Sequence, residues 1–139
     1  MVWRLLNRVC SLMLGGAVTG SNLNVSNWDA AFATSTKSIV NTQSGNYTLV
    51  LTDAGKTIHK AAGGAGETHT IPANASVAYD IGTLIAWQND GGGDLTIAIT
   101  SDTLTGTDGA TGSRTLGDNH AAVIQKMTAT TWKYAASDL

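Results

Sequence analysis

The sequence predicts an all-β protein, an antiparallel β-sandwich of the jelly-roll type with an N-terminal arm. Short runs of alternating apolar and polar residues recur from residue 38 to the end of the chain. Turns rich in Gly, Asp and Asn separate these runs about every ten residues, as in sandwiches and jelly rolls. No helical segment alternates with the strands, which argues against a parallel sheet. We therefore divide the chain into an arm, residues 1–35, and a sandwich domain, residues 36–139.

Composition narrows the function classes. The 139 residues are enough for one domain, and the net charge of -2 argues against a nucleic-acid partner, which requires clustered Lys and Arg. Charged residues make up 13% of the chain, against about 25% in an average protein. The single cysteine, Cys10, excludes an intramolecular disulfide and is expected to be a small buried apolar residue. No apolar run approaches the length of a membrane span, so we expect no membrane partner.

The arm carries the residues that we expect to contact another surface. Apolar residues recur at helical spacing between residues 2 and 14, which predicts a short amphipathic helix ending at Gly15-Gly16. The same stretch also resembles a secretory signal peptide. A short helix with one apolar face must dock, either on its own sandwich or on a neighbouring subunit. The predicted contact residues of the arm are Val2, Trp3, Leu5, Leu6, Val9, Trp28 and Phe32.

The sandwich domain contains a series of short predicted strands. They are Ser38–Thr42, Tyr47–Thr52, Thr57–Lys60, Glu67–Ile71, Thr83–Gln88 and Leu95–Thr100, then short strands near Thr103 and at Ser113–Leu116, and a final hairpin of Ala121–Met127 with Thr131–Ala135. In the second strand, Tyr47, Leu49 and Leu51 are expected to share one face. Such one-sided strands are typical of antiparallel sheets with one face on a core.

Candidate chemical sites are few. His59, Glu67 and His69 would lie near each other if their strands were adjacent, and a metal needs at least three such ligands. Exposed polar positions on neighbouring strands are the simpler interpretation. No serine lies in a nucleophile elbow, and Glu67 is the only glutamate, which argues against paired catalytic carboxylates. We therefore expect no catalytic residue, no metal and no cofactor.

Two further motifs have a structural and a functional interpretation. Residues 90–97 resemble one copy of the calcium-binding nonapeptide of β-rolls, but that motif works by repetition. We expect a hairpin turn there instead, because Gly and Asp are ordinary turn residues. Trp87, Trp132 and Tyr134 can form an aromatic platform for a sugar, but we expect them to fill the core.

Part of the chain resembles a module that recurs in the virion proteins of tailed bacteriophages, namely tail fibres, head fibres and capsid-decoration proteins. The similar stretches are Tyr47-Thr-Leu-Val-Leu-Thr-Asp-Ala-Gly-Lys56, Thr70-Ile-Pro-Ala-Asn-Ala-Ser-Val77, Ile81-Gly-Thr-Leu-Ile85 and the closing segment Ala122-Val-Ile-Gln-Lys-Met-Thr-Ala-Thr-Thr-Trp-Lys-Tyr134. The likeness covers most of the β region and none of residues 1–35.

The resemblance implies a non-enzymatic structural protein. A short chain with an arm before the module fits a capsid cement or decoration protein on the capsid exterior, where it would bind the major capsid protein and itself, as a dimer or trimer. A tail-fibre or head-fibre component is the alternative within this class. A secreted carbohydrate-binding module is the alternative outside it.

Overall fold

The structure is a computed structural model that describes residues 37–137. The predicted arm residues and the proposed boundary after residue 35 lie outside this range. The described elements are β1 (Val40–Gln43), β2 (Tyr47–Thr48), the 3₁₀ turn η1 (Leu51–Asp53), β3 (Thr57–Lys60), β4 (Glu67–Ile71), β5 (Leu84–Asn89), β6 (Leu95–Ile99), β7 (Thr103–Gly106), β8 (Arg114–Leu116), β9 (Ala121–Thr128) and β10 (Thr131–Ala136).

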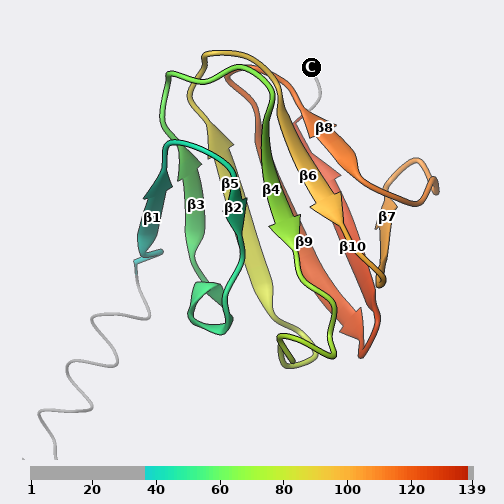
Figure 1. The fold of residues 1–139 in the computed structure, drawn as a ribbon. Coiled ribbons are helices and arrows are strands. Elements are labelled where there is room, and N and C mark those ends of the chain that lie inside the picture. The colour runs from blue at the N-terminus through green and yellow to red at the C-terminus, as the bar shows by residue number, and fades with distance from the viewer. Residues whose placement is uncertain (1–36, 138–139) are drawn as a thin grey trace, which may run out of the picture. The chain divides into compact units, whose positions relative to one another are not determined.

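These strands form two sheets packed face to face, which confirms the predicted all-β sandwich. The six-stranded sheet has the order β1-β3-β5-β9-β10-β7, and the four-stranded sheet has the order β2-β4-β6-β8. In Figure 1 the four-stranded sheet lies in front of the six-stranded one. From β1 to β9, each strand belongs to the sheet opposite to that of the strand before it.

The pairing inside the sheets is mixed, so the expectation that neighbouring strands are antiparallel throughout is wrong. Parallel pairs are β1–β3, β3–β5, β2–β4, β4–β6 and β10–β7, whereas β5–β9, β9–β10 and β6–β8 are antiparallel. Parallel neighbours need a crossover, which is usually a helix. Here a strand of the opposite sheet serves as the crossover. The absence of a helical pattern therefore did not exclude parallel strands.

The core lies between the sheets and is formed by the inward-facing residues of the alternating strands. Its fully buried members are Leu49, Ile58, Ile71, Ile85, Trp87, Leu95, Ile97, Leu104, Leu116, Ile124 and Trp132. Trp87, Trp132 and Tyr134 are at most 7% exposed, which confirms that they fill the core. A sugar platform made of these three side chains is thereby excluded.

Several strands match the sequence prediction, and one does not. Strands β3 and β4 have the predicted bounds, and the closing hairpin of β9 and β10 is confirmed. The predicted strand Tyr47–Thr52 is wrong, because β2 ends at Thr48 and the chain turns into η1. Leu49 is buried, but Leu51 is 56% exposed, so the two do not share a face.

Polar side chains close the two lateral edges of the sandwich. At the edge formed by β1 and β2, Asn41 donates a hydrogen bond to the phenol oxygen of Tyr47. At the opposite edge, formed by β7 and β8, the guanidinium of Arg114 donates to both carboxylate oxygens of Asp108, at 3.0 and 3.1 Å. Polar side chains at the edge strands disfavour pairing with strands of other molecules. They also separate the apolar core from solvent at these edges.

His69 makes the core sensitive to acid. Its Nδ1 accepts a hydrogen bond from the indole nitrogen of Trp87 at 3.1 Å, so this nitrogen must be unprotonated, because indole is only a donor. Burial lowers the pKa of His69 below its ordinary value of 6.5, and Lys60 lowers it further, although Gly45 and Glu67 act in the opposite direction. The unfolded chain therefore takes up this proton first as the pH falls.

We expect the thermal unfolding midpoint to fall as the pH is lowered from 7 to 5, because protonation of His69 in this window favours the unfolded state. The His69→Gln variant should show a flatter profile over the same range. The matched control is His59→Gln, which makes the same substitution at a partly exposed histidine outside the core. Equal slopes for all three proteins would contradict this role of His69.

Candidate interaction surface

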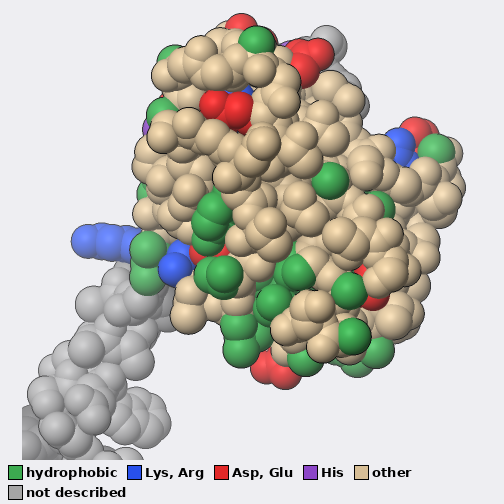
Figure 2. Space-filling model, in the orientation of Figure 1, with side chains coloured by type: hydrophobic (Ala, Val, Ile, Leu, Met, Phe, Trp, Pro, Cys, Tyr) green, Lys and Arg blue, Asp and Glu red, His purple; other side chains and the backbone are tan. Residues whose placement is uncertain are grey.

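Six of the eight large apolar side chains that are exposed among the described residues lie at one end of the sandwich, where β1 and β5 begin and β9 ends. We call this surface the apolar end; its described members are Ile39, Val50, Leu51, Ile81, Leu84 and Met127. In Figure 2, hydrophobic side chains concentrate in the lower part of the surface, whereas the area over β4 and β6 is almost entirely uncharged and polar. Leu51 is 56% exposed and Ile81 is 70% exposed. An apolar group of this kind typically marks a contact site.

Backbone hydrogen bonds join the segments that carry these side chains. The amide of Thr57 donates to the carbonyl of Ile39, and the amide of Gly55 donates to the carbonyl of Leu84. The amide of Gly82 donates to the carbonyl of Lys126, next to Met127. The apolar end is therefore built on hydrogen-bonded segments.

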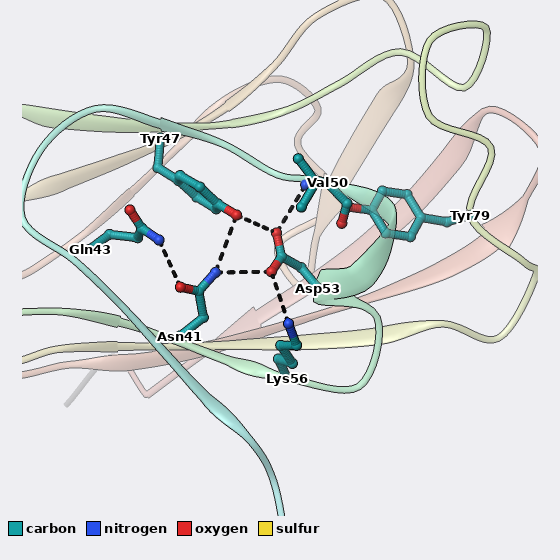
Figure 3. Close-up of polar contacts among 7 residues, drawn as sticks. All are labelled: Asn41, Gln43, Tyr47, Val50, Asp53, Lys56 and Tyr79. Atoms are coloured by element: carbon teal, nitrogen blue, oxygen red, sulfur yellow. Dashed lines mark hydrogen bonds and ion pairs between the residues drawn. The ribbon is translucent and has the colours of Figure 1, made fainter.

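A buried carboxylate shapes the loop that carries Val50 and Leu51. Asp53 is 1% exposed. Its Oδ2 accepts hydrogen bonds from the Tyr47 hydroxyl at 2.8 Å and from the Val50 amide at 2.9 Å, and its Oδ1 accepts one from Asn41 at 2.9 Å. Figure 3 shows these donors converging on the carboxylate from β1, β2 and the loop. With Asp53 turned inward, the short η1 turn leaves Leu51 on the outside.

The ammonium of Lys56 and a hydrogen bond from Gln43 further stabilise the position of Asp53. The ammonium of Lys56 lies 3.8 Å from Asp53 Oδ1, and Gln43 donates to Asn41 Oδ1 at 2.7 Å, which orients the Asn41 amide toward the carboxylate. Burial raises the pKa of Tyr47, and its hydrogen bond to Asp53 raises it further, so Tyr47 remains a neutral donor. A buried carboxylate with three hydrogen-bond donors is satisfied, whereas one that loses them is costly.

Tyr79 ties the second loop of the apolar end to the first. Its hydroxyl donates to the carbonyl of Val50 at 2.6 Å, as Figure 3 shows. Its ring packs edge-on against Trp132, with ring centroids 5.5 Å apart. Burial raises the pKa of Tyr79, and Asp53 adds to the effect, so the hydroxyl stays protonated. Ile81 follows two residues later, so the Tyr79 contacts anchor the segment that carries it.

A second buried charge lies near the same end. The ammonium of Lys126 lies 3.8 Å from Asp102 Oδ2 and 4.7 Å from the centre of the Trp132 ring. Asp102 also accepts a hydrogen bond from the amide of Asn74 at 3.1 Å. These contacts connect β9 with the segments after β4 and β6, so they stabilise the base on which the apolar end rests.

The predicted metal candidates do not converge. His59 lies in the six-stranded sheet, where its Nε2 is 2.7 Å from Asp90 and its Nδ1 is 3.1 Å from the Thr42 hydroxyl. Glu67 and His69 lie on β4 of the other sheet, and His69 faces the core. Among residues 37–137 no three His, Cys, Asp or Glu side chains are placed to hold a metal ion.

The Gly-rich segment after β5 is a crossover between the sheets, so the expected hairpin turn is wrong. The strands β5 and β6 that it joins belong to different sheets. Asn89 fixes the segment by donating to the carbonyls of Gly93, Leu116 and Gly117, and Lys60 donates to the carbonyl of Gly91 at 2.7 Å. These hydrogen bonds hold the segment against the neighbouring parts of the sandwich.

Sequence reasoning missed the apolar end. The predicted contact residues Val2, Trp3, Leu5, Leu6, Val9, Trp28 and Phe32 all lie outside the described residues, so the structure does not place them. One signal was present: Ile81 is a bulky aliphatic residue between the turn residues Asp80 and Gly82. For Leu51 the signal misled, because its alternation with Leu49 predicts burial.

Comparison with known proteins gives no relative: no family model, no curated protein and no solved structure matches this chain. Among the described residues there is also no helix that is long and apolar enough to cross a membrane.

Replacing Asp53 by Ala is expected to lower the free energy of unfolding by about 3 kcal/mol, because it removes the acceptor of three buried donors. Urea denaturation measures the change. Asp108→Ala is the matched control, since Asp108 is exposed and its paired charge is screened by solvent. Similar small losses in the two variants would show that Asp53 does not hold the loop.

Proposed function

We propose that this protein is a non-enzymatic structural component of a tailed-phage particle. Its role would be that of a capsid cement or decoration protein that binds the major capsid protein on the outside of the shell and bridges subunits. The observation that carries the proposal is the apolar end, a group of exposed aliphatic side chains on loops held by buried polar groups. The resemblance of the β region to phage virion modules supplies the class of partner.

The chemistry of this surface fits a protein partner. Aliphatic side chains offer contact area but no group that can carry out a reaction. Each of these half-exposed side chains contributes about 1 kcal/mol when a partner covers it, which gives modest affinity per copy. On a shell, many copies bind at equivalent positions, and a chain that contacts two subunits gains from effective concentration. Modest affinity is therefore sufficient.

The arm would provide the second contact. Its predicted apolar residues, with Trp28 and Phe32, would reach a neighbouring subunit while the apolar end binds the first. Two linked contacts are what bridging requires. A fibre component would instead be present in few copies at the tail or at head vertices.

The double variant Leu51→Lys with Ile81→Lys is expected to bind shells at least about tenfold more weakly, because it places charges in an apolar contact. Co-sedimentation with shells that lack this protein measures the binding. The matched control is Thr96→Lys with Thr115→Lys, which adds the same charge on the outer face of the four-stranded sheet. If both double variants bind as wild type does, the apolar end is not the capsid contact.

Deleting residues 1–35 is expected to leave the sandwich folded but to abolish the stable decoration of shells, because only one of two contacts remains. Circular dichroism checks the fold, and the occupancy of purified shells measures the binding. Full occupancy by the truncated protein would refute the role of the arm. A copy number in particles far below that of the major capsid protein would favour the fibre alternative.

A further inference from the structure

The outer face of the six-stranded sheet carries a row of small and β-branched side chains, apolar except for Thr57, that runs straight across five strands. Its members occupy directly paired register positions: Val40 beside Thr57, Thr57 beside Ala86, Ala86 beside Val123 and Val123 beside Ala135. We call this set the cross-strand row. All five side chains are small or β-branched, and Val40 and Val123 are exposed.

Two shallow hollows flank the row, and both are lined by Val123 and Ala135. One hollow has a volume of about 450 Å³ and also contacts Leu84 and Lys133, and the other has about 580 Å³ and also contacts Thr57 and Ala86. Because they share these two lining residues, the hollows adjoin each other on this face. Among residues 37–137, Lys133 is the only charged residue that lines either hollow.

We propose that this face is the contact between two copies of the chain, related by a two-fold axis that runs along the cross-strand row. A two-fold contact uses the same patch on both copies, so the patch must be complementary to itself. An axis along the row places each side chain of the row against its own symmetry mate, and four of these five contacts are between apolar side chains. The flanking row of Leu84, Gln125 and Lys133 then meets the opposite flanking row of Gln88, Ala121 and Ser137.

The charge distribution is compatible with this geometry. Lys133 lies one register row away from the axis and faces the polar position of Ser137, so the two lysines of a dimer do not meet. Residues on successive positions of one face are about 7 Å apart along a strand. The two ammonium groups are therefore separated by more than 10 Å, about one Debye length, and their repulsion is screened.

The size of the face sets the strength of the contact. Six strands spaced about 4.8 Å apart make a sheet roughly 24 Å wide, and strands of about six residues are roughly 20 Å long. The face therefore measures roughly 500 Å², and a dimer buries roughly 1,000 Å² in total, the lower limit of specific interfaces. This area predicts a dimer that dissociates on dilution.

The outer face of the four-stranded sheet differs and supplies the control surface. Its paired outward positions are occupied by Thr68, Thr96 and Thr115 in one row and by Thr48, Thr70 and Ala98 in the next. No large apolar residue is exposed on its described strands. Hydroxyl groups on this face are well solvated. Burying this face against a partner therefore yields less free energy than burying the cross-strand row. The inference does not depend on the proposed function, since self-association requires no capsid.

Sedimentation equilibrium of the full chain over a range of concentrations tests the proposal. We expect a monomer–dimer equilibrium in the wild type. The variants Val123→Arg and Ala135→Arg should each raise the dimer dissociation constant at least about tenfold, because they place two guanidinium groups near the axis. Thr96→Arg, on the control surface, should leave the constant unchanged.

The outcomes are distinct. A wild type that remains monomeric at the highest concentration overturns the proposal, as does a dimer that survives both arginine variants or is lost equally in Thr96→Arg. Circular dichroism of each variant distinguishes loss of the dimer contact from loss of the fold. Arginine is introduced at two positions, Val123 and Ala135, in case one variant does not fold.

Discussion

The arrangement of the candidate surface depends on the burial of one carboxylate. Asp53 is withdrawn from water at the edge of the sandwich, and a charge in that position is stable only with several donors around it. Those donors come from β1, from β2 and from the loop itself. The chain must turn just after Leu49 so that the Val50 amide can donate to the Asp53 carboxylate. The strand that begins at Tyr47 is therefore short, and Leu51 is placed in solvent.

The same constraint extends to the second loop through Val50. The carbonyl of Val50 accepts the Tyr79 hydroxyl, while its amide donates to Asp53, so one peptide segment is held from both sides. Tyr79 is in turn packed on Trp132 of the core. The position of Ile81 is thus linked to the core through buried contacts, although Ile81 itself is exposed. A contact surface fixed in this way loses little conformational entropy on binding.

The sequence predicts well what is local in this fold and poorly what is not. Residues 57–60 and 67–71 were predicted with correct bounds, because alternation within one strand depends only on neighbouring residues. The direction of pairing depends on which sheet each strand joins, and the chain crosses between sheets after nearly every strand. No residue pattern within a single strand reports that crossing. The parallel pairs were therefore missed, even though the strands themselves were found.

The candidate surface was missed for the same physical reason. Whether Leu51 is buried depends on Asp53, and Asp53 is buried because Asn41 and Tyr47 lie beside it in the folded chain. The alternating pattern predicts that Leu51 is buried on the same face as Leu49. The hydrogen bonds to Asp53 instead turn the chain after Leu49, and Leu51 is exposed. A buried carboxylate such as Asp53 and an exposed aliphatic side chain such as Leu51 are the opposite of what folding stability alone favours. The apolar end has this arrangement, whereas the core between the sheets is largely apolar. The exposed side chains of the apolar end are therefore available for binding, because the fold does not depend on their burial.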